Sequence, residues 1–276
     1  PLSILEKKNG NLIFTNSGLT PNETWYEYPA VVELNIDDYS LVSTWDTTSQ
    51  VIDGFWGIYH NSSSFMVVNQ MSEDKNGNVW VTNPYCEKNK NLLAIQLSGE
   101  DSYSHVQIPD ETSYLPESIA FDKLNRVWLG FAYESLEEQI YSNGGMKVFT
   151  YSDLHFEEPG DSTWLNILNP NDLPGGNATA SVLSLVFDKM DFLWILNEKG
   201  IRGYTYTVSG SEVTIDPILK SNDGEAIDFL GQIGFTKGNR IKVDSQNNKW
   251  IITHQGIWVI QESMAYWPSE EGLHPD

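Results

Sequence analysis

The feature that most constrains this chain is an aspartate followed six residues later by a tryptophan, which occurs four times. The copies are Asp74 with Trp80, Asp122 with Trp128, Asp188 with Trp194, and Asp244 with Trp250. A fifth, decayed copy places Ile13 in the tryptophan position, because residues 8–16 match residues 75–83. One unit recurring at intervals of roughly 50 residues or more indicates a repeat architecture.

The segments around each aspartate have the composition of two β-strands joined by a turn. Apolar runs such as 118–121 and 126–131 flank polar residues that favour turns, and an aspartate can close such a turn by hydrogen bonding to the backbone two residues on. Further strands are expected at 92–97, 103–108, 146–151, 163–168, 203–207, 213–218, 256–260 and 264–267. Four strands per unit predict an all-β chain, a β-propeller built from four-stranded antiparallel blades. The four repeated tryptophans then pack between blades and bind no ligand.

Composition excludes several classes of partner. The chain has 38 acidic and 16 basic residues, a net charge of -22, which repels nucleic acid and anionic membranes. No stretch approaches the roughly 20 apolar residues that span a bilayer, so we expect no membrane insertion in this segment. Cys86 is the single cysteine, so no intrachain disulfide forms.

The repeat, apolar-x-Phe/Val-Asp, five variable residues and Trp-apolar, resembles the two-component regulator propeller repeat. The resemblance implies a bacterial periplasmic or extracellular protein, because such repeats form the sensors of hybrid histidine kinases and related propellers occur on surface components of the type IX secretion system. Full rings of that kind carry seven or more blades. We expect the first unit to begin at its second strand, without the inner one, and residues 267–276 to form a loop that would lead into another inner strand.

We therefore expect a single propeller domain, 1–276, with about five visible blades of a larger ring. The approximate blades are 1–46, 64–109, 116–168, 180–218 and 238–268.

The position of the inserts predicts where a ligand would bind. If the strands of a blade are lettered a to d from the axis outward, the b-to-c and d-to-a connections emerge on one face, and these hold the long segments 46–63, 84–91, 132–144, 169–180 and 219–238. Long loops on a rigid scaffold are common binding sites. The candidate ligand-binding residues there are Trp56, Tyr59, His60, Tyr85, Tyr133 and Tyr141. Aromatic and polar residues together suit a sugar, and the alternative is that these aromatics pack between blades.

Catalytic and metal motifs are absent from the sequence. The five histidines, His60, His105, His155, His254 and His274, lack metal-ligand spacing, and no nucleophile elbow or phosphate loop occurs. The segment 74–78 has alternating oxygen-bearing side chains but no distal glutamate, so it is interpreted as a turn and not a calcium loop. We expect no cofactor and no metal.

These observations favour a non-catalytic extracytoplasmic propeller that binds a glycan or a protein on its loop-rich face. The first alternative is a structural or assembly propeller of a type IX secretion system component. The second is a propeller lyase or glycosidase, for which acidic pairs such as Glu157 and Glu158 would supply acid-base groups. An acidic loop face favours neutral or cationic partners over sulfated or phosphorylated glycans.

Overall fold

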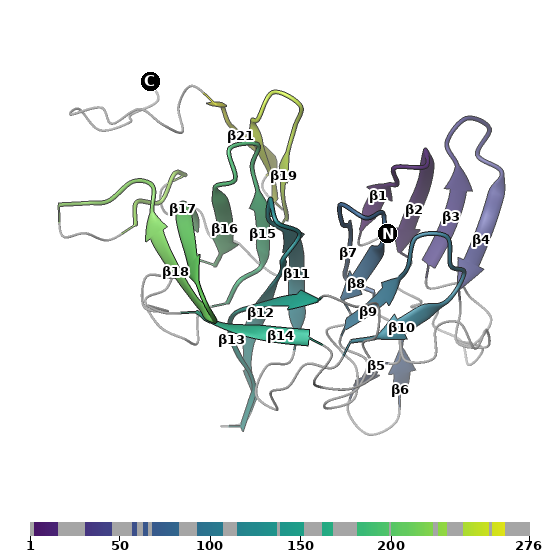
Figure 1. The fold of residues 1–276 in the computed structure, drawn as a ribbon, viewed down its shortest axis with the longest axis horizontal. Coiled ribbons are helices and arrows are strands. Elements are labelled where there is room, and N and C mark those ends of the chain that lie inside the picture. Colours follow the sequence, from purple (N-terminus) through teal and green to yellow (C-terminus); the bar gives the residue numbers. More distant parts are fainter. Residues whose placement is uncertain are drawn as a thin grey trace.

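Every regular element in the part of the chain that the structure describes is a β-strand (Figure 1). The computed structural model describes residues 3–15, 31–45, 57–59, 63–65, 68–82, 93–106, 115–136, 139–151, 162–167, 181–198, 200–222, 226–230, 240–253 and 256–262. Over these ranges, no helix is long and apolar enough to cross a bilayer.

The strands form five successive blades, each an antiparallel meander in chain order. Blade 1 contains β1 (Ile4–Glu6), β2 (Asn11–Thr15), β3 (Val31–Asn35) and β4 (Leu41–Trp45). Blade 2 contains β7 (Gln70–Glu73), β8 (Val79–Thr82), β9 (Leu93–Gln96) and β10 (Tyr103–His105). Blade 3 contains β11 (Pro116–Phe121), β12 (Val127–Leu136), β13 (Gln139–Tyr151) and β14 (Ser162–Ile167). Blade 4 contains β15 (Ser184–Phe187), β16 (Leu193–Asn197), β17 (Gly200–Ser209) and β18 (Glu212–Pro217).

Blade 5 contains β19 (Arg240–Val243), β20 (Lys249–Thr253) and β21 (Gly256–Ile260). Its expected fourth strand, 264–267, lies outside the described residues. A small hairpin of β5 (Gly57–Tyr59) and β6 (Ser63–Phe65) stands between blades 1 and 2 in the chain. The inner strands β1, β7, β11, β15 and β19 pack against one another in that order, which confirms the predicted β-propeller.

One expectation from the sequence was wrong. The first blade does not lack its inner strand, because β1 pairs with β2 in the register Ile4 to Phe14. The inner strand was missed because blade 1 matches the other repeats closely only from Lys8 onward. Blades 3 and 4 each keep four antiparallel strands, and their outer strands β14 and β18 also pair in parallel, which joins the two blades into one eight-stranded sheet.

The repeated aspartate holds the turn between strands a and b, as the sequence predicted. In blade 2 one carboxylate oxygen of Asp74 accepts the backbone N–H groups of Asn76 and Asn78, at 2.8 and 3.0 Å. The other oxygen accepts Nε1–H of Trp80 at 3.0 Å. The same bonds recur in the other three copies, which explains the spacing of six residues.

Three of the four repeated tryptophans, Trp80, Trp128 and Trp194, pack between blades as predicted, whereas Trp250 of blade 5 is 40% exposed. Trp80 of blade 2 contacts Phe149 and Tyr151 of blade 3, with ring centroids 5.9 and 5.3 Å apart, and Trp128 contacts Phe187 of blade 4 at 5.3 Å. The buried apolar residues accordingly form four clusters, one at each blade junction. Hydrophobic burial therefore stabilises the molecule junction by junction, as in other repeat proteins.

Polar side chains also join each blade to the next at the axis. The residue just before each repeat accepts a backbone N–H from the following blade. The bonds are Met71 N–H to Ser3 Oγ, Ile119 N–H to Gln70 Oε1, Leu185 N–H to Ser118 Oγ and Ile241 N–H to Ser184 Oγ, at 3.1, 3.1, 2.8 and 3.2 Å. Arg240 occupies the same position in blade 5.

Candidate functional site

The two faces of the propeller differ in the connections that they carry. All a-to-b turns are short, such as residues 74–78 between β7 and β8, and they lie on one face. The opposite face takes the longer connections, including residues 46–69 and 218–239. On that face β12 and β13 remain paired to Leu136 and Gln139, so their hairpin extends past the blade and projects at the bottom of Figure 1.

Tyr133 is the one candidate ligand-binding residue whose side chain the structure describes. It lies on the extended part of β12, opposite Asn143 of β13, and is 37% exposed. Its backbone N–H donates to Oγ of Ser181 at 2.9 Å, which ties the hairpin to the start of blade 4. The other candidates, Trp56, Tyr59, His60, Tyr85 and Tyr141, lie outside the described residues or have only their backbone described, so their grouping stays a prediction.

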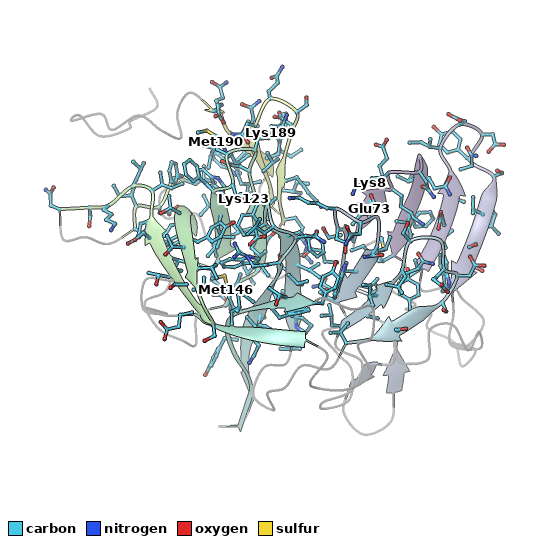
Figure 2. The ribbon with its side chains drawn as sticks, viewed as in Figure 1. Lys8, Glu73, Lys123, Met146, Lys189 and Met190 are labelled. Atoms are coloured by element: carbon cyan, nitrogen blue, oxygen red, sulfur yellow. The ribbon has the colours of Figure 1, made fainter. Side chains whose placement is uncertain are left out.

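A cavity of about 310 Å³ lies along the axis between the inner strands of the blades. Its lining includes Lys8, Gln70, Ser72, Glu73, Lys75 and Lys242. The groups contributed by the a-to-b turns are largely engaged with one another. The carboxylate of Glu73 accepts the backbone N–H of Lys8 at 2.8 Å, and the two residues adjoin in Figure 2. Lys8 Nζ in turn donates to the carbonyl of Asp74 at 2.6 Å.

Lys242 brings a cation to the cavity wall from β19. Lys242 is exposed, but partial desolvation by the surrounding protein lowers the pKa of its ammonium, and the positive charge of Arg240 lowers it further. Both effects disfavour the charged form of an amine.

A buried polar cluster joins several blades near the axis. Asn69 Nδ2 donates to the carboxylate of Glu117 at 2.5 Å, and Arg240 Nη2 donates to Asn69 Oδ1 at 2.7 Å. Arg240 lies 3.9 Å from Glu117, and its Nη1 donates to the carbonyl of Leu183 at 3.5 Å. Burial lowers the pKa of the Arg240 guanidinium, and the Glu117 carboxylate opposes this shift. Blades 2, 3, 4 and 5 thus meet in one network.

This cluster was not predicted from the sequence, since none of its residues belongs to a motif. One signal in the sequence could have revealed it. The residue immediately before the repeat is Gln70, Ser118 or Ser184 in blades 2 to 4, but it is Arg240 in blade 5. A cation there needs a carboxylate partner inside the ring, and Glu117 supplies it. The described residues contain no group of three or more His, Cys, Asp or Glu side chains arranged to hold a metal.

Comparison with known proteins identifies the fold. No protein-family model matches the sequence, and no curated protein sequence matches it. PorZ of Porphyromonas gingivalis, a surface component of the type IX secretion system, has a TM-score of 0.61 and 14% identity over 95% of this chain and 32% of its own. A putative gluconolactonase has a TM-score of 0.52 and 11% identity over 94% of this chain and 72% of its own.

The extracellular domain of the putative one component system BT4673 from B. thetaiotaomicron has a TM-score of 0.50 and 15% identity over 93% of this chain and 26% of its own. The chain therefore spans less than two thirds of PorZ and of BT4673. At these identities the similarity establishes a shared fold. The similar structures thus include a surface component of the type IX secretion system, the extracellular domain of a putative one component system and a putative gluconolactonase.

Proposed function

We propose that the chain is a non-catalytic, extracytoplasmic binding module that holds a glycan or a protein on the face carrying its long connections. The observation that carries the proposal is Tyr133, an exposed aromatic side chain on a paired hairpin that extends beyond its blade. An aromatic ring on a rigid support can stack on the apolar face of a sugar or on a protein side chain, with little conformational entropy to lose.

The use of ionisable groups elsewhere supports binding over acid-base catalysis. The repeated aspartates accept several turn hydrogen bonds each, and Glu117 faces Arg240 and Asn69. Hydrogen bonds bring the pKa of the Asp74 and Asp244 carboxyls below the ordinary value, so these two groups are poor proton donors near neutral pH. The similarity to PorZ and to the extracellular domain of BT4673 supports a location outside the cytoplasm.

The test is a screen of neutral and sulfated oligosaccharides by glycan array, followed by calorimetry on Tyr133→Ala. We expect saturable binding of a neutral or cationic ligand that weakens at least about tenfold, or about 1.4 kcal/mol, in the variant. The control is Tyr39→Ala, because Tyr39 is 70% exposed on a c-to-d turn of the opposite face. If Tyr133→Ala and the wild type bind the ligand with equal affinity, Tyr133 is not part of the binding site. Tight heparin binding at moderate salt would overturn the expected charge preference.

A further inference from the structure

The short a-to-b turns bring one lysine from each of four successive blades to the same face. In blades 2 to 4 the lysine follows the repeated aspartate, and in blade 1 it has the matching position. These residues, here called the lysine row, are Lys8, Lys75, Lys123 and Lys189, and all four are exposed. In Figure 2 the labelled Lys8, Lys123 and Lys189 lie away from the hairpin of β12 and β13 that projects at the bottom. The turns point along the axis, so a blade beside them leaves them uncovered.

Most of the positive charge of the lysine row is not neutralised by an ion pair. The ammonium groups of Lys8, Lys75 and Lys189 donate to backbone carbonyls of the next blade, those of Asp74, Lys123 and Ser245, respectively. A carbonyl takes one of the three N–H donors of an ammonium and leaves its charge in place. Within the described residues, Lys123 is the one member that pairs with a carboxylate, that of Asp191 at 3.2 Å, and the Lys123 side chain is 67% exposed.

The buried aspartates beneath the row have cations of their own. Asp122 lies 2.5 Å from Nε of Arg126, and Asp188 lies 3.0 Å from Nζ of Lys249. Both cations reach the carboxylates from strand b of a blade, and their side chains are at most 12% exposed. The exposed lysines are therefore not required to compensate these two buried charges, and their charge remains available to a partner.

The surface between the turns of blades 2 and 3 is hollowed and locally basic. A hollow of about 460 Å³ is lined by Lys75, Lys123 and Arg126 and by no acidic residue. This reverses the balance of the whole chain, which has 38 acidic and 16 basic residues. Leu124 also lines the hollow and is 66% exposed, and Met190, at the matching position of blade 4, is 57% exposed. Apolar side chains thus stand beside the lysines.

The c-to-d turns surround this basic centre with an acidic rim. They lie on the same face, and their exposed carboxylates include Asp37 and Asp38 of blade 1, Glu100 of blade 2 and Glu212 of blade 4. A short acidic segment can reach the lysines between these groups, whereas a long polyanion has to pass over the rim and is repelled. Such repulsive elements select among partners of the same charge.

We propose that the lysine row binds a short acidic segment of a partner protein. Carboxylates of the segment pair with Lys75 and Lys123, and an apolar side chain packs on Leu124 and Met190. Exposed apolar side chains beside the cations favour a peptide over an inorganic anion. The site lies on the face opposite Tyr133, so it is independent of the glycan or protein site proposed above.

Fluorescence anisotropy tests the proposal with a labelled short peptide of glutamates and two leucines, titrated with the full chain. We expect saturable binding that weakens as salt increases, because the lysines are exposed. The double variant Lys75→Gln with Lys123→Gln should weaken binding at least about tenfold. Glutamine keeps an N–H donor for the turn carbonyl but removes the charge. The matched control is Lys220→Gln, because Lys220 is 48% exposed and pairs with Asp216 beyond this face, and Tyr133→Ala should also bind like the wild type.

Urea denaturation of each variant verifies that the fold is retained. A wild-type chain that does not bind the peptide overturns the proposal, and so does an unchanged affinity in the double variant. Equal binding of a peptide with glutamines in place of the glutamates would mean that apolar contact alone is responsible. Equally tight binding of a single-stranded DNA oligonucleotide also overturns the proposal, because the lysine row would then bind any polyanion.

Discussion

At the scale of single residues, the repeated aspartate of blades 2, 3 and 4 is a buried carboxylate that accepts several hydrogen bonds. Burial raises the pKa of the Asp74 carboxyl, but hydrogen bonds from Tyr151, Trp80 and Asn78 outweigh burial and bring the pKa below its ordinary value. Tyr151 belongs to blade 3, so one carboxylate closes its own turn and binds the neighbouring blade. Asp188 does the same with Lys249 of blade 5, whose Nζ lies 3.0 Å away.

Replacing Asp74 by Asn tests this role through its dependence on pH. A carboxyl whose folded pKa lies below the unfolded value stabilises the protein above the unfolded pKa, and this stabilisation is lost as pH falls through the folded pKa. We expect Asp74→Asn to be about 1–3 kcal/mol less stable at neutral pH, since its amide turns N–H groups toward donors. The difference from the wild type should shrink below about pH 4, where the wild-type carboxyl begins to protonate.

Urea denaturation of both proteins at neutral and acid pH measures the effect. The control is Asp216→Asn, because Asp216 is exposed on β18 and pairs with Lys220 at the surface. Surface pairs of this kind contribute little, so Asp216→Asn should match the wild type at both pH values. If the difference in free energy of unfolding between Asp74→Asn and the wild type is the same at neutral and acid pH, the stabilising role assigned to the Asp74 carboxylate is wrong.

At the scale of elements, each a-to-b turn ends in a residue with left-handed backbone. The residues and their φ angles are Gly10 at 84°, Gly77 at 83°, Asn125 at 64°, Asp191 at 66° and Asn247 at 67°. Gly, Asn and Asp tolerate this region best. The Asn and Asp side chains have a second use, because each accepts the backbone N–H of the lysine that follows the repeated aspartate in the preceding blade.

Asn125 allows these two contributions to be separated. Asn125→Gly keeps the backbone conformation but loses the bond from Lys75 N–H, 2.9 Å long, and the bond from Asn125 Nδ2 to the Tyr151 hydroxyl, 3.0 Å long. Asn125→Ala loses the same two bonds and strains the turn as well. We expect Gly to cost about 1 kcal/mol for each lost bond, and Ala to cost about 1–2 kcal/mol more, as thermal and urea denaturation would measure. If Ala and Gly prove equally stable, the left-handed backbone does not limit this turn.

At the scale of the whole molecule, stability is distributed along the ring. Each of the four apolar clusters belongs to one junction, and blades 3 and 4 are additionally joined by β14 and β18. The junction of blades 1 and 2 has Ile13 where the others have tryptophan, and it uses Trp45 of β4 against Tyr103 of β10 at 5.7 Å. Proteins of this kind open locally, in units set by neighbouring repeats.

Hydrogen exchange followed by mass spectrometry should therefore show regional stability. We expect Trp128→Ala to remove about 3–5 kcal/mol from the junction of blades 3 and 4 and to speed exchange in β11 to β18 before β1 to β4. Trp250→Ala is the matched control, because it occupies the same repeat position on an exposed face and should change exchange little. Uniformly faster exchange across all blades in Trp128→Ala would mean that the propeller unfolds as one unit.

The all-β propeller, the role of the aspartate turns and the packing of three of the four repeated tryptophans were predictable from the sequence, but the exposure of Trp250 was not. These depend on contacts within one repeat or between adjacent repeats, so a fixed spacing such as Asp74 to Trp80 records them directly. The inner strand of blade 1 was missed, because the repeat there is reduced to residues after Lys8.

Only the tertiary structure decided which groups meet across the ring. Arg240 and Asn69 are 171 residues apart in the chain yet form a hydrogen bond, and nothing in either residue's neighbourhood predicts the other. The parallel pairing of β14 with β18 and the exposure of Trp250 are also properties of the arrangement of blades. A local pattern specifies which side of a strand is apolar, but whether that side is covered depends on what the whole fold places against it.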